Sequence, residues 1–212
     1  MTEILVWIAI FLTTVILHEL CHGLAAYALG DPTAKENGRL TLNPIKHLDI
    51  WWTILLPALL FFSTHGRFAI GMAKPVPVNF NRLRHPKRDM IWVALAGPLA
   101  NIVLATVLAF AWRFFGSPSI DADTPANYFL YGVYFNLGLA MFNLIPIPPL
   151  DGSKILAGML PLSVAVRFLQ IEPVGYIIIL ALYFTHLLFY AMIPGIDLFC
   201  RFLNVPRLGV NF

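Results

Sequence analysis

A long apolar segment near the N-terminus, from about Ile4 to Leu29, limits what this chain can fold into. It exceeds the roughly 20 residues that a membrane-spanning helix needs, and Gly30-Asp31-Pro32 ends it. Within it lie two histidines and a carboxylate, His18, Glu19 and His22. Ionisable groups at membrane depth are costly and usually mark a functional site. We therefore expect a helix that crosses a bilayer and carries polar chemistry.

The composition places the chain among membrane proteins. Hydrophobic residues make up 59% of it and charged residues 12%, whereas soluble domains average about 25% charged residues. With 212 residues, we expect one membrane-embedded domain, with a core over about 4–155 and C-terminal helices over 156–212. The net charge of +3 argues against nucleic acid as a partner. Two cysteines, Cys21 and Cys200, do not make a disulfide framework.

The apolar stretches predict an all-α polytopic membrane protein with about four full transmembrane helices. Segment 51–63 contains Pro57 and is too short for an ordinary span, so it is expected to be re-entrant or half-spanning. Residues 152–170 predict a short helix at the surface of the bundle. The four predicted spans are about Ile4–Leu29, Met90–Phe115, Tyr128–Ile147 and Pro173–Ile193.

The charges of the loops predict the topology. Loop 64–89 is rich in Lys and Arg, which places it in the cytoplasm by the positive-inside rule. Loop 116–127 and the N-terminus have no Lys or Arg, so both are expected outside, and the C-terminal tail with them. These assignments agree only if segment 51–63 does not cross the membrane. Because His18 lies about 21 Å along the helix from Ile4, we expect the histidines near the cytoplasmic face of the cell membrane.

His18, Glu19 and His22 form a motif for zinc chemistry. Residues four apart on a helix share a face, so both histidines and the neighbouring Glu19 can address one point. A catalytic zinc ion takes three protein ligands and keeps one position open. The histidines supply two ligands, and Glu19 is the expected general base for the water.

The third ligand has to come from another part of the chain. Asp151 is preferred because it follows a helix-breaking run over 143–150, and irregular backbone at membrane depth is tolerated only where it is buried or lines a cavity. The alternative is that Asp151 caps a helix over 152–170. The other candidates within the membrane are His186, Cys21 and Asp49.

Two motifs far apart in the sequence resemble the site-2 protease family of intramembrane zinc metalloproteases. They are His18-Glu19-x-x-His22 and the run from Asn143 through Pro146 to Leu150-Asp151-Gly152. Three further stretches are similar to that family: Asn43-Pro44 to His47, Gly71 to Asn79, and Gly97 to Asn101. This chain resembles a compact member, with no PDZ-like domain and no nucleotide-sensing CBS domain.

The resemblance implies a zinc endopeptidase that cuts single-span transmembrane proteins within the lipid bilayer, near its cytoplasmic face. It implies one Zn²⁺ per chain, held by His18, His22 and Asp151. It also implies that Glu19 is the catalytic base, and that Asn143 binds the substrate or stabilises the oxyanion.

The segment Lys74–Asn79 has prolines at alternate positions, which predicts extended backbone. A helical substrate hides its amides in its own hydrogen bonds, so it has to unwind before cleavage. We therefore expect Lys74, Val76 and Val78 to pair with an unwound substrate by strand addition.

Two other functions would use the same metal ligands. A zinc transporter or storage protein needs no carboxylate beside His18, and transporters usually have internal repeats, which this sequence does not show. A catalytically silent scaffold for transmembrane helices has no reason to keep Glu19 and all three ligands. Replacing Glu19 separates both alternatives from a protease.

Overall fold

A computed structural model describes residues 2–55, 59, 62–63, 74–115 and 127–207. The described residues form helices and no strand, which confirms the predicted all-α class. Within the described residues, three short helical segments lie between the helices Thr33–Glu36 and Pro86–Phe115: η1 (Pro44–His47), η2 (Ile50–Leu55) and η3 (Phe80–Arg82). The α-helices are α1 (Thr2–Ala28), α2 (Thr33–Glu36), α4 (Pro86–Phe115), α5 (Asn127–Asn143), α6 (Asp151–Met159), α7 (Leu162–Leu169), α8 (Glu172–Phe184) and α9 (Leu187–Leu203).

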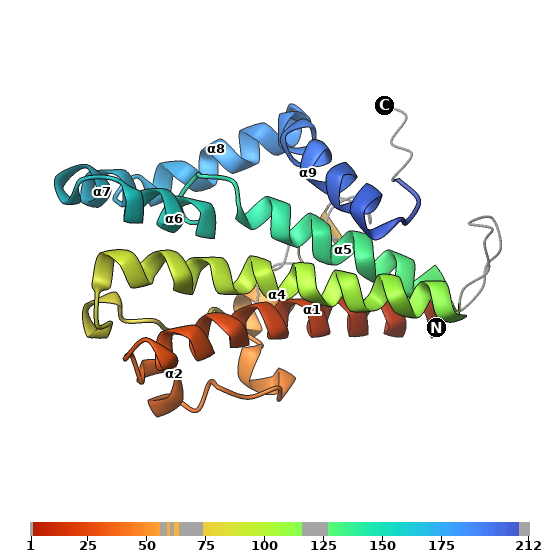
Figure 1. The fold of residues 1–212 in the computed structure, drawn as a ribbon, viewed down its shortest axis with the longest axis horizontal. Coiled ribbons are helices and arrows are strands. Elements are labelled where there is room, and N and C mark those ends of the chain that lie inside the picture. The colour runs from red at the N-terminus through yellow and green to blue at the C-terminus, as the bar shows by residue number, and fades with distance from the viewer. Residues whose placement is uncertain (1, 56–58, 60–61, 64–73, 116–126, 208–212) are drawn as a thin grey trace.

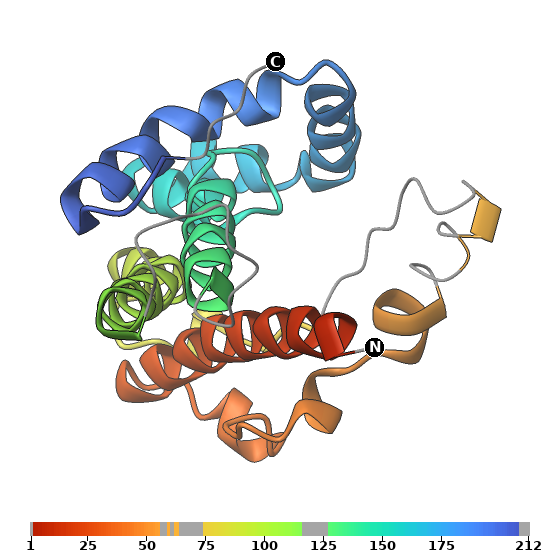
Figure 2. The ribbon, with the colours of Figure 1, turned by 90° about the vertical axis from the view of Figure 1, so that its right-hand side faces the viewer.

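The helices α1, α4 and α5 lie side by side and alternate in direction (Figures 1 and 2). Helix α4 packs against both of the others. Since α1 and α5 run the same way, the later part of α1, the beginning of α4 and the end of α5 meet at one end of the bundle. The histidine motif His18–His22 and the turn that carries Asp151 both lie toward this end.

Small side chains bring α4, α5 and α9 into close contact. Leu130, Val133 and Leu137 of α5 are buried against Ala105 and Ala109 of α4. Small residues let helix backbones approach one another, which favours packing inside a bilayer. Helix α9 completes this cluster with buried Ile196, Cys200 and Leu203.

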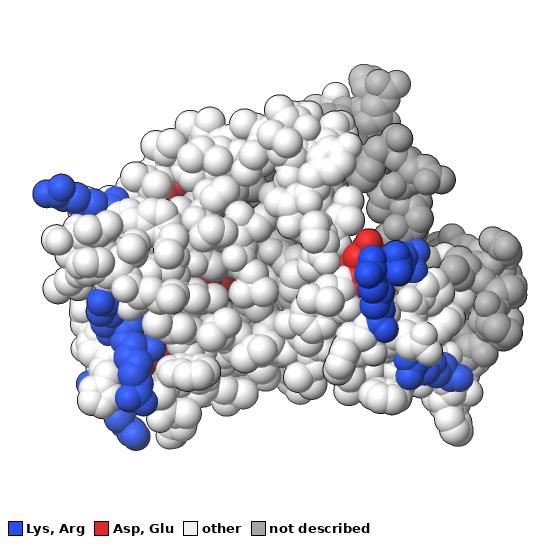
Figure 3. All heavy atoms as spheres, turned by 45° about the horizontal axis from the view of Figure 1, so that its top comes forward, with Lys and Arg blue, Asp and Glu red and all other residues white. Residues whose placement is uncertain are grey.

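Among the residues that the structure describes, two helices are long and apolar enough to cross a membrane, over Leu5–Ala28 and Pro86–Phe115. The pair α7 and α8, bent by 61°, is a third if it counts as one span. Helix α5 has 17 residues, fewer than the roughly 20 of an ordinary span. Figure 3 shows Lys and Arg gathered at the two ends of the long axis, with a nearly uncharged band between them. The chain is thus a membrane protein, although the predicted count of four full spans is not reproduced.

Two predicted helices are divided in the structure. The expected span 173–193 breaks between α8 and α9 at His186, whose φ of 60° is left-handed. The expected helix 152–170 breaks at Pro161 into α6 and α7. Proline has no N–H for the helix and pushes the preceding residue into extended backbone, and Leu160 has φ −77° and ψ 156°.

Helix α1 ends at Ala28, one residue before the predicted end at Leu29, and Gly30 forms the turn that follows. This glycine has φ 111°, which side-chain-bearing residues rarely adopt. The turn lets the N–H of Asp31 donate to the carbonyl of Ala26 (2.9 Å), closing a common helix end. The buried carboxylate of Asp31 then accepts the N–H of Thr33 (3.0 Å) and the N–H of Asn79 (2.6 Å).

The segment Lys74–Asn79 is neither helix nor strand. Its N–H at Lys74 donates to the carbonyl of His47 (3.0 Å). Nη2 of the buried Arg39 donates to the carbonyls of Lys74 (2.7 Å) and Pro75 (3.2 Å). The segment is therefore held by His47 and Arg39, and the extended backbone predicted for it forms no β-strand within the described residues.

The predicted re-entrant segment 51–63 is described only in part. Residues Ile50–Leu55 form the turn η2. Most of the remainder lies outside the described residues, as do 64–73 and 116–126. The re-entrant path therefore stays a prediction.

The environment of Asp31 controls its ionisation. Burial alone would raise the pKa of this carboxyl, but hydrogen bonds from Thr33 and Asn79 outweigh burial and hold the pKa below its ordinary value. A lowered pKa in the folded state means that the carboxylate stabilises the fold above the ordinary pKa. That stabilisation is lost as the pH falls through the folded-state pKa.

We expect Asp31→Asn to lower the Tm of the detergent-solubilised protein at neutral pH, because an amide accepts these hydrogen bonds more weakly. The difference from the unchanged protein should shrink below about pH 4. Thermal unfolding at neutral pH and at about pH 3 measures both. The exposed Glu172, changed to Gln, is the control and should show little effect. An equal loss of Tm at both pH values would contradict the assignment.

Candidate metal centre

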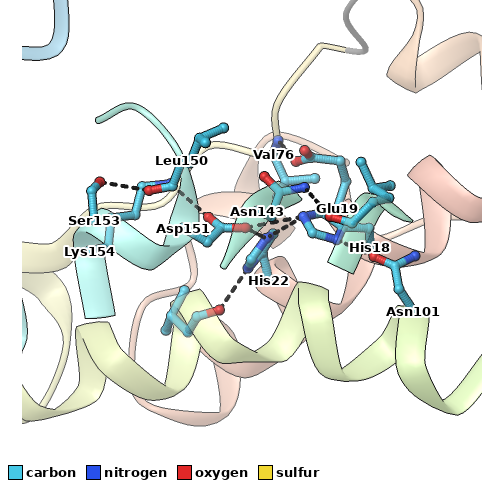
Figure 4. Close-up of polar contacts among 12 residues, drawn as sticks. His18, Glu19, His22, Val76, Asn101, Asn143, Leu150, Asp151, Ser153 and Lys154 are labelled. Atoms are coloured by element: carbon cyan, nitrogen blue, oxygen red, sulfur yellow. Dashed lines mark hydrogen bonds and ion pairs between the residues drawn. The ribbon is translucent and has the colours of Figure 1, made fainter. Parts of the chain in front are cut away.

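The side chains of His18, His22 and Asp151 converge on one point (Figure 4). The Nε2 atoms of the two histidines are 3.0 Å apart. Oδ2 of Asp151 lies 3.2 Å from Nε2 of His18 and 3.0 Å from Nε2 of His22. All three residues are buried, with exposed fractions between 4% and 8%. Within the described residues, this is the one group of three or more such side chains that could hold a metal ion.

Asp151 reaches the histidines from a tight turn between α5 and α6. It is the first residue of α6, and the N-cap position belongs to Leu150, with no side-chain cap hydrogen bond. The alternative that Asp151 is a helix cap is therefore wrong. A side chain at the next position, Gly152, would collide with the backbone carbonyl of Leu144. The glycine thus allows the close turn that presents Asp151.

The atoms of these side chains that point away from the centre are held by other groups. Nδ1 of His18 lies 2.6 Å from Oδ1 of Asn101, and Nδ1 of His22 lies 2.7 Å from the carbonyl oxygen of Val93. Nζ of Lys154 donates to Oδ1 of Asp151 (3.0 Å). Metal-binding histidines nearly always donate their second ring N–H to such an acceptor. Each of the three side chains is therefore left with one atom directed to the centre.

The geometry fits zinc. Zinc bonds to imidazole and carboxylate are about 2.0–2.1 Å long, so two ligands at a tetrahedral angle lie about 3.3–3.4 Å apart. The observed separations of 3.0–3.2 Å are within a few tenths of an ångström of this value. Two imidazoles and one carboxylate also match the three-ligand set of catalytic zinc sites, which keep a further position open.

The contact between α1 and α4 depends on Gly97. A side-chain carbon at this position would lie 2.6 Å from Cε1 of His18 and would collide with Nε2 of His22. Glycine lets the histidine pair lie directly on the backbone of α4. This close approach also brings Nδ1 of His22 to the Val93 carbonyl.

Glu19, the predicted base, is attached to the segment Lys74–Asn79. Its Oε2 accepts a hydrogen bond from the backbone N–H of Val76 (2.7 Å). Val76 itself is buried, and Gly23, one turn after Glu19 on α1, packs against its side chain. The fixed segment thus orients a carboxylate on the helix that carries the histidines.

Asn143 is the last residue of α5 and lies beside the three converging side chains (Figure 4). It is half-buried, and its Nδ2 donates to the carbonyl of Leu139 one turn earlier (3.0 Å). An amide nitrogen carries two hydrogens, so one donor remains. The structure thus brings Asn143 to the site.

The other ligand candidates lie outside the group. His186 is exposed at the break between α8 and α9. Oδ1 of Asp49 accepts the N–H of Trp51 (2.9 Å), which ties Asp49 to the first turn of η2. Cys21 is half-buried on α1 and is not among the converging side chains.

Asn101 and Lys154 hold two of the three side chains. Asn101 belongs to the family-like stretch Gly97 to Asn101, and it is a polar residue in the middle of a predicted span, but its contact with His18 was not predicted. Lys154 lies three residues after Asp151 on one helix, a spacing at which side chains meet. The carbonyl of Val93 has no sequence signal, since every residue has such a group.

The chain matches one family model and several known proteins. A family model described as Peptidase family M50 matches residues 117–186, which include Asn143 and Asp151 but not the histidine pair. The chain is 38% identical over 186 residues to "Putative zinc metalloprotease YwhC" of Bacillus subtilis, covering 85% of this chain and 81% of that protein. No solved structure matches the chain significantly.

More distant relatives carry similar names. "Putative zinc metalloprotease Rip2" of Mycolicibacterium smegmatis is 33% identical over 145 residues, which are 68% of this chain and 53% of that protein. "Zinc metalloprotease MJ0392" of Methanocaldococcus jannaschii is 30% identical over 131 residues, which are 55% of this chain and 37% of that protein. The family model and the extended similarity to YwhC agree with the arrangement of the motifs, and this chain belongs to the site-2 protease family, peptidase family M50.

Proposed function

We propose that this protein is an intramembrane zinc endopeptidase that binds one Zn²⁺ through His18, His22 and Asp151. The observation that carries the proposal is the convergence of three electron-pair donors whose other polar atoms are already engaged. The names of the relatives, all zinc metalloproteases, support the same metal and reaction.

The hydrogen bonds at Nδ1 of the histidines leave lone pairs on Nε2 that favour a bound cation at the centre. A backbone carbonyl only accepts, so Nδ1 of His22 has to donate to Val93. When Nδ1 carries the hydrogen, the Nε2 of a neutral imidazole offers a lone pair. Lone pairs from both rings and from the Asp151 carboxylate then face one another within 3.0–3.2 Å. Such groups repel unless a proton or a metal cation lies among them, and a set of two imidazoles and one carboxylate suits zinc.

Peptide hydrolysis at this site would use a bound zinc ion, Glu19 and Asn143, each for a different step. A bound zinc ion supplies a Lewis acid, which makes water acidic enough to react near neutral pH. Glu19 takes the proton from water and returns it to the leaving amine. The N–H of Val76 holds one oxygen of this carboxylate in place. The second amide hydrogen of Asn143, which no hydrogen bond within the described residues engages, would be available to a developing oxyanion.

The segment Lys74–Asn79 supports pairing with an unwound single-span substrate. Its N–H groups at Lys74, Val76 and Asn79 already donate within the protein. Within the described residues, no hydrogen bond engages the N–H of Val78. Backbone groups of an extended segment that are left unpaired are the groups that bind an added strand. Val78 is therefore the position where we place substrate pairing.

We further propose that the protein lies in the cell membrane with its N-terminus outside and its site near the cytoplasmic face. The beginning of α4 meets the histidine end of α1. Arg82, Arg84, Lys87 and Arg88 lie at or just before that point. Positive residues beside spans favour the cytoplasm.

Two substitutions test the metal and the base separately. Asp151→Ala should lose zinc as well as cleavage of a single-span reporter in proteoliposomes. Glu19→Gln should keep about one zinc per chain and lower cleavage by about 10²–10⁴-fold. Elemental analysis and gel analysis of the reporter measure the two properties. Asp49→Ala is the matched control and should retain both. Zinc retained in Asp151→Ala would contradict the ligand set, and cleavage retained in Glu19→Gln would exclude Glu19 as the base.

Pairing at Val78 is tested by removing one N–H. Val78→Pro should strongly reduce reporter cleavage and leave zinc content unchanged, because proline cannot donate to a substrate strand. Val78→Ala keeps the N–H and should cleave almost as well as the unchanged protein. Val76→Pro is less informative, since it also removes the hydrogen bond to Glu19. Equal cleavage by the two Val78 variants would rule out pairing at this position.

The tight contact at Gly97 gives a prediction about metal affinity. Gly97→Ala should weaken zinc binding by about 10–100-fold, because the added carbon separates the histidines from α4 and breaks the contact with Val93. Competition with a chelator measures the affinity. Gly138→Ala on α5 is the control, since a side chain there meets nothing within 4 Å. Similar affinities for both variants would show that α4 moves aside without cost.

A further inference from the structure

A polar chain crosses three helices inside the apolar bundle and ends at His18. It consists of Thr14 on α1, Asn136 on α5 and Asn101 on α4. All three are buried, with exposed fractions of at most 1%. Buried amides without partners are costly in apolar surroundings, so the order of donors and acceptors along such a chain is strongly restricted.

The chain begins at a group whose role is fixed. Nδ2 of Asn136 lies 2.8 Å from the carbonyl oxygen of Gly132 and 3.0 Å from Oγ1 of Thr14. Because a backbone carbonyl only accepts, the amide nitrogen of Asn136 has to face Gly132. Its amide oxygen is thereby turned toward Asn101.

The same reasoning fixes Asn101. Its Nδ2 donates to Oδ1 of Asn136 (3.0 Å) and to the backbone carbonyl of Thr14 (3.3 Å). Both partners accept, so the nitrogen cannot exchange places with the oxygen. Oδ1 of Asn101 therefore faces Nδ1 of His18 at 2.6 Å. Since this oxygen only accepts, Nδ1 of His18 has to carry the hydrogen.

We propose that Asn101 is a positioning residue that sets the tautomer of His18, and that Asn136 and Thr14 fix Asn101 in the required orientation. Two backbone carbonyls, those of Thr14 and Gly132, determine the direction of every hydrogen bond up to the imidazole. The result is a lone pair on Nε2, directed to the centre where His22 and Asp151 converge. Calling His18 a zinc ligand rests on the proposed function, whereas the tautomer does not.

The two histidines are controlled in different ways. His22 obtains its acceptor from the backbone of α4, at Val93, which substitution cannot remove. His18 depends on a side chain that is itself held by two others. A change at Asn101 should therefore affect His18 and leave His22 unaltered, and this selectivity distinguishes positioning from a general loss of structure.

The test is ¹⁵N NMR of histidine-labelled, metal-free protein in detergent, at a pH high enough to keep the imidazoles neutral. In the unchanged protein, both rings should carry hydrogen on Nδ1. Asn101→Leu should shift His18 toward the Nε2–H form without changing His22, and should weaken zinc binding by about 10–100-fold. Asn127→Leu, another buried asparagine on α5, is the control and should change neither ring.

The outcomes separate this inference from the proposed function. Hydrogen on Nε2 of His18 in the unchanged protein would overturn the inference even if zinc binds, and needs no variant to fold. An unaltered His18 tautomer in folded Asn101→Leu would overturn it as well. The expected tautomers in a protein that binds no zinc would support the inference and contradict the zinc endopeptidase.

Discussion

A histidine inside an apolar bundle needs a partner for each of its ring nitrogens, and the arrangement of the other helices follows from this requirement. Helix α4 meets it for His22 with a backbone carbonyl and for His18 with Asn101. Helix α5 then has to satisfy Asn101, which it does through Asn136. The contacts that orient the site are thus also contacts that hold α1, α4 and α5 together, and the polar groups gain partners that the surrounding lipid cannot offer.

Glycine and proline shape the site as much as the polar residues do. Gly97 allows the backbone of α4 to lie on the histidine pair, and Gly152 allows the turn that carries Asp151 to close on Leu144. The proline-rich run after α5 ends that helix and starts the turn to α6. The carboxylate of Asp151, the first residue of α6, can therefore reach α1. A side chain at Gly97 would push the histidines away from α4, and a side chain at Gly152 would push the Asp151 turn away from Leu144. The centre is therefore formed by close packing, with the polar residues placed on it.

The parts of the structure that could be predicted from sequence depend on local signals. The apolar run and Gly30 define α1, and the spacing of His18 and His22 places both rings on one face. The break at His186 has no such signal, because neither glycine nor proline stands there. The orientation of Asn101 depends on Asn136 and Thr14, which are distant in sequence and meet only in the folded bundle. The hydrogen bond from Val76 to Glu19 likewise joins segments whose proximity no local pattern reveals.

The hydrogen bond from Val76 to Glu19 limits how a molecule can approach the histidines. Val76 and Asn79 bind Glu19 and Asp31, so the segment Lys74–Asn79 is attached to α1 at two points, and Arg39 holds it from behind. A peptide approaching between this segment and α1 would have to break both attachments. The segment is accordingly a fixed wall of the site. If the protein cleaves peptides as proposed, water and a peptide would reach the histidines by a route that leaves this segment in place.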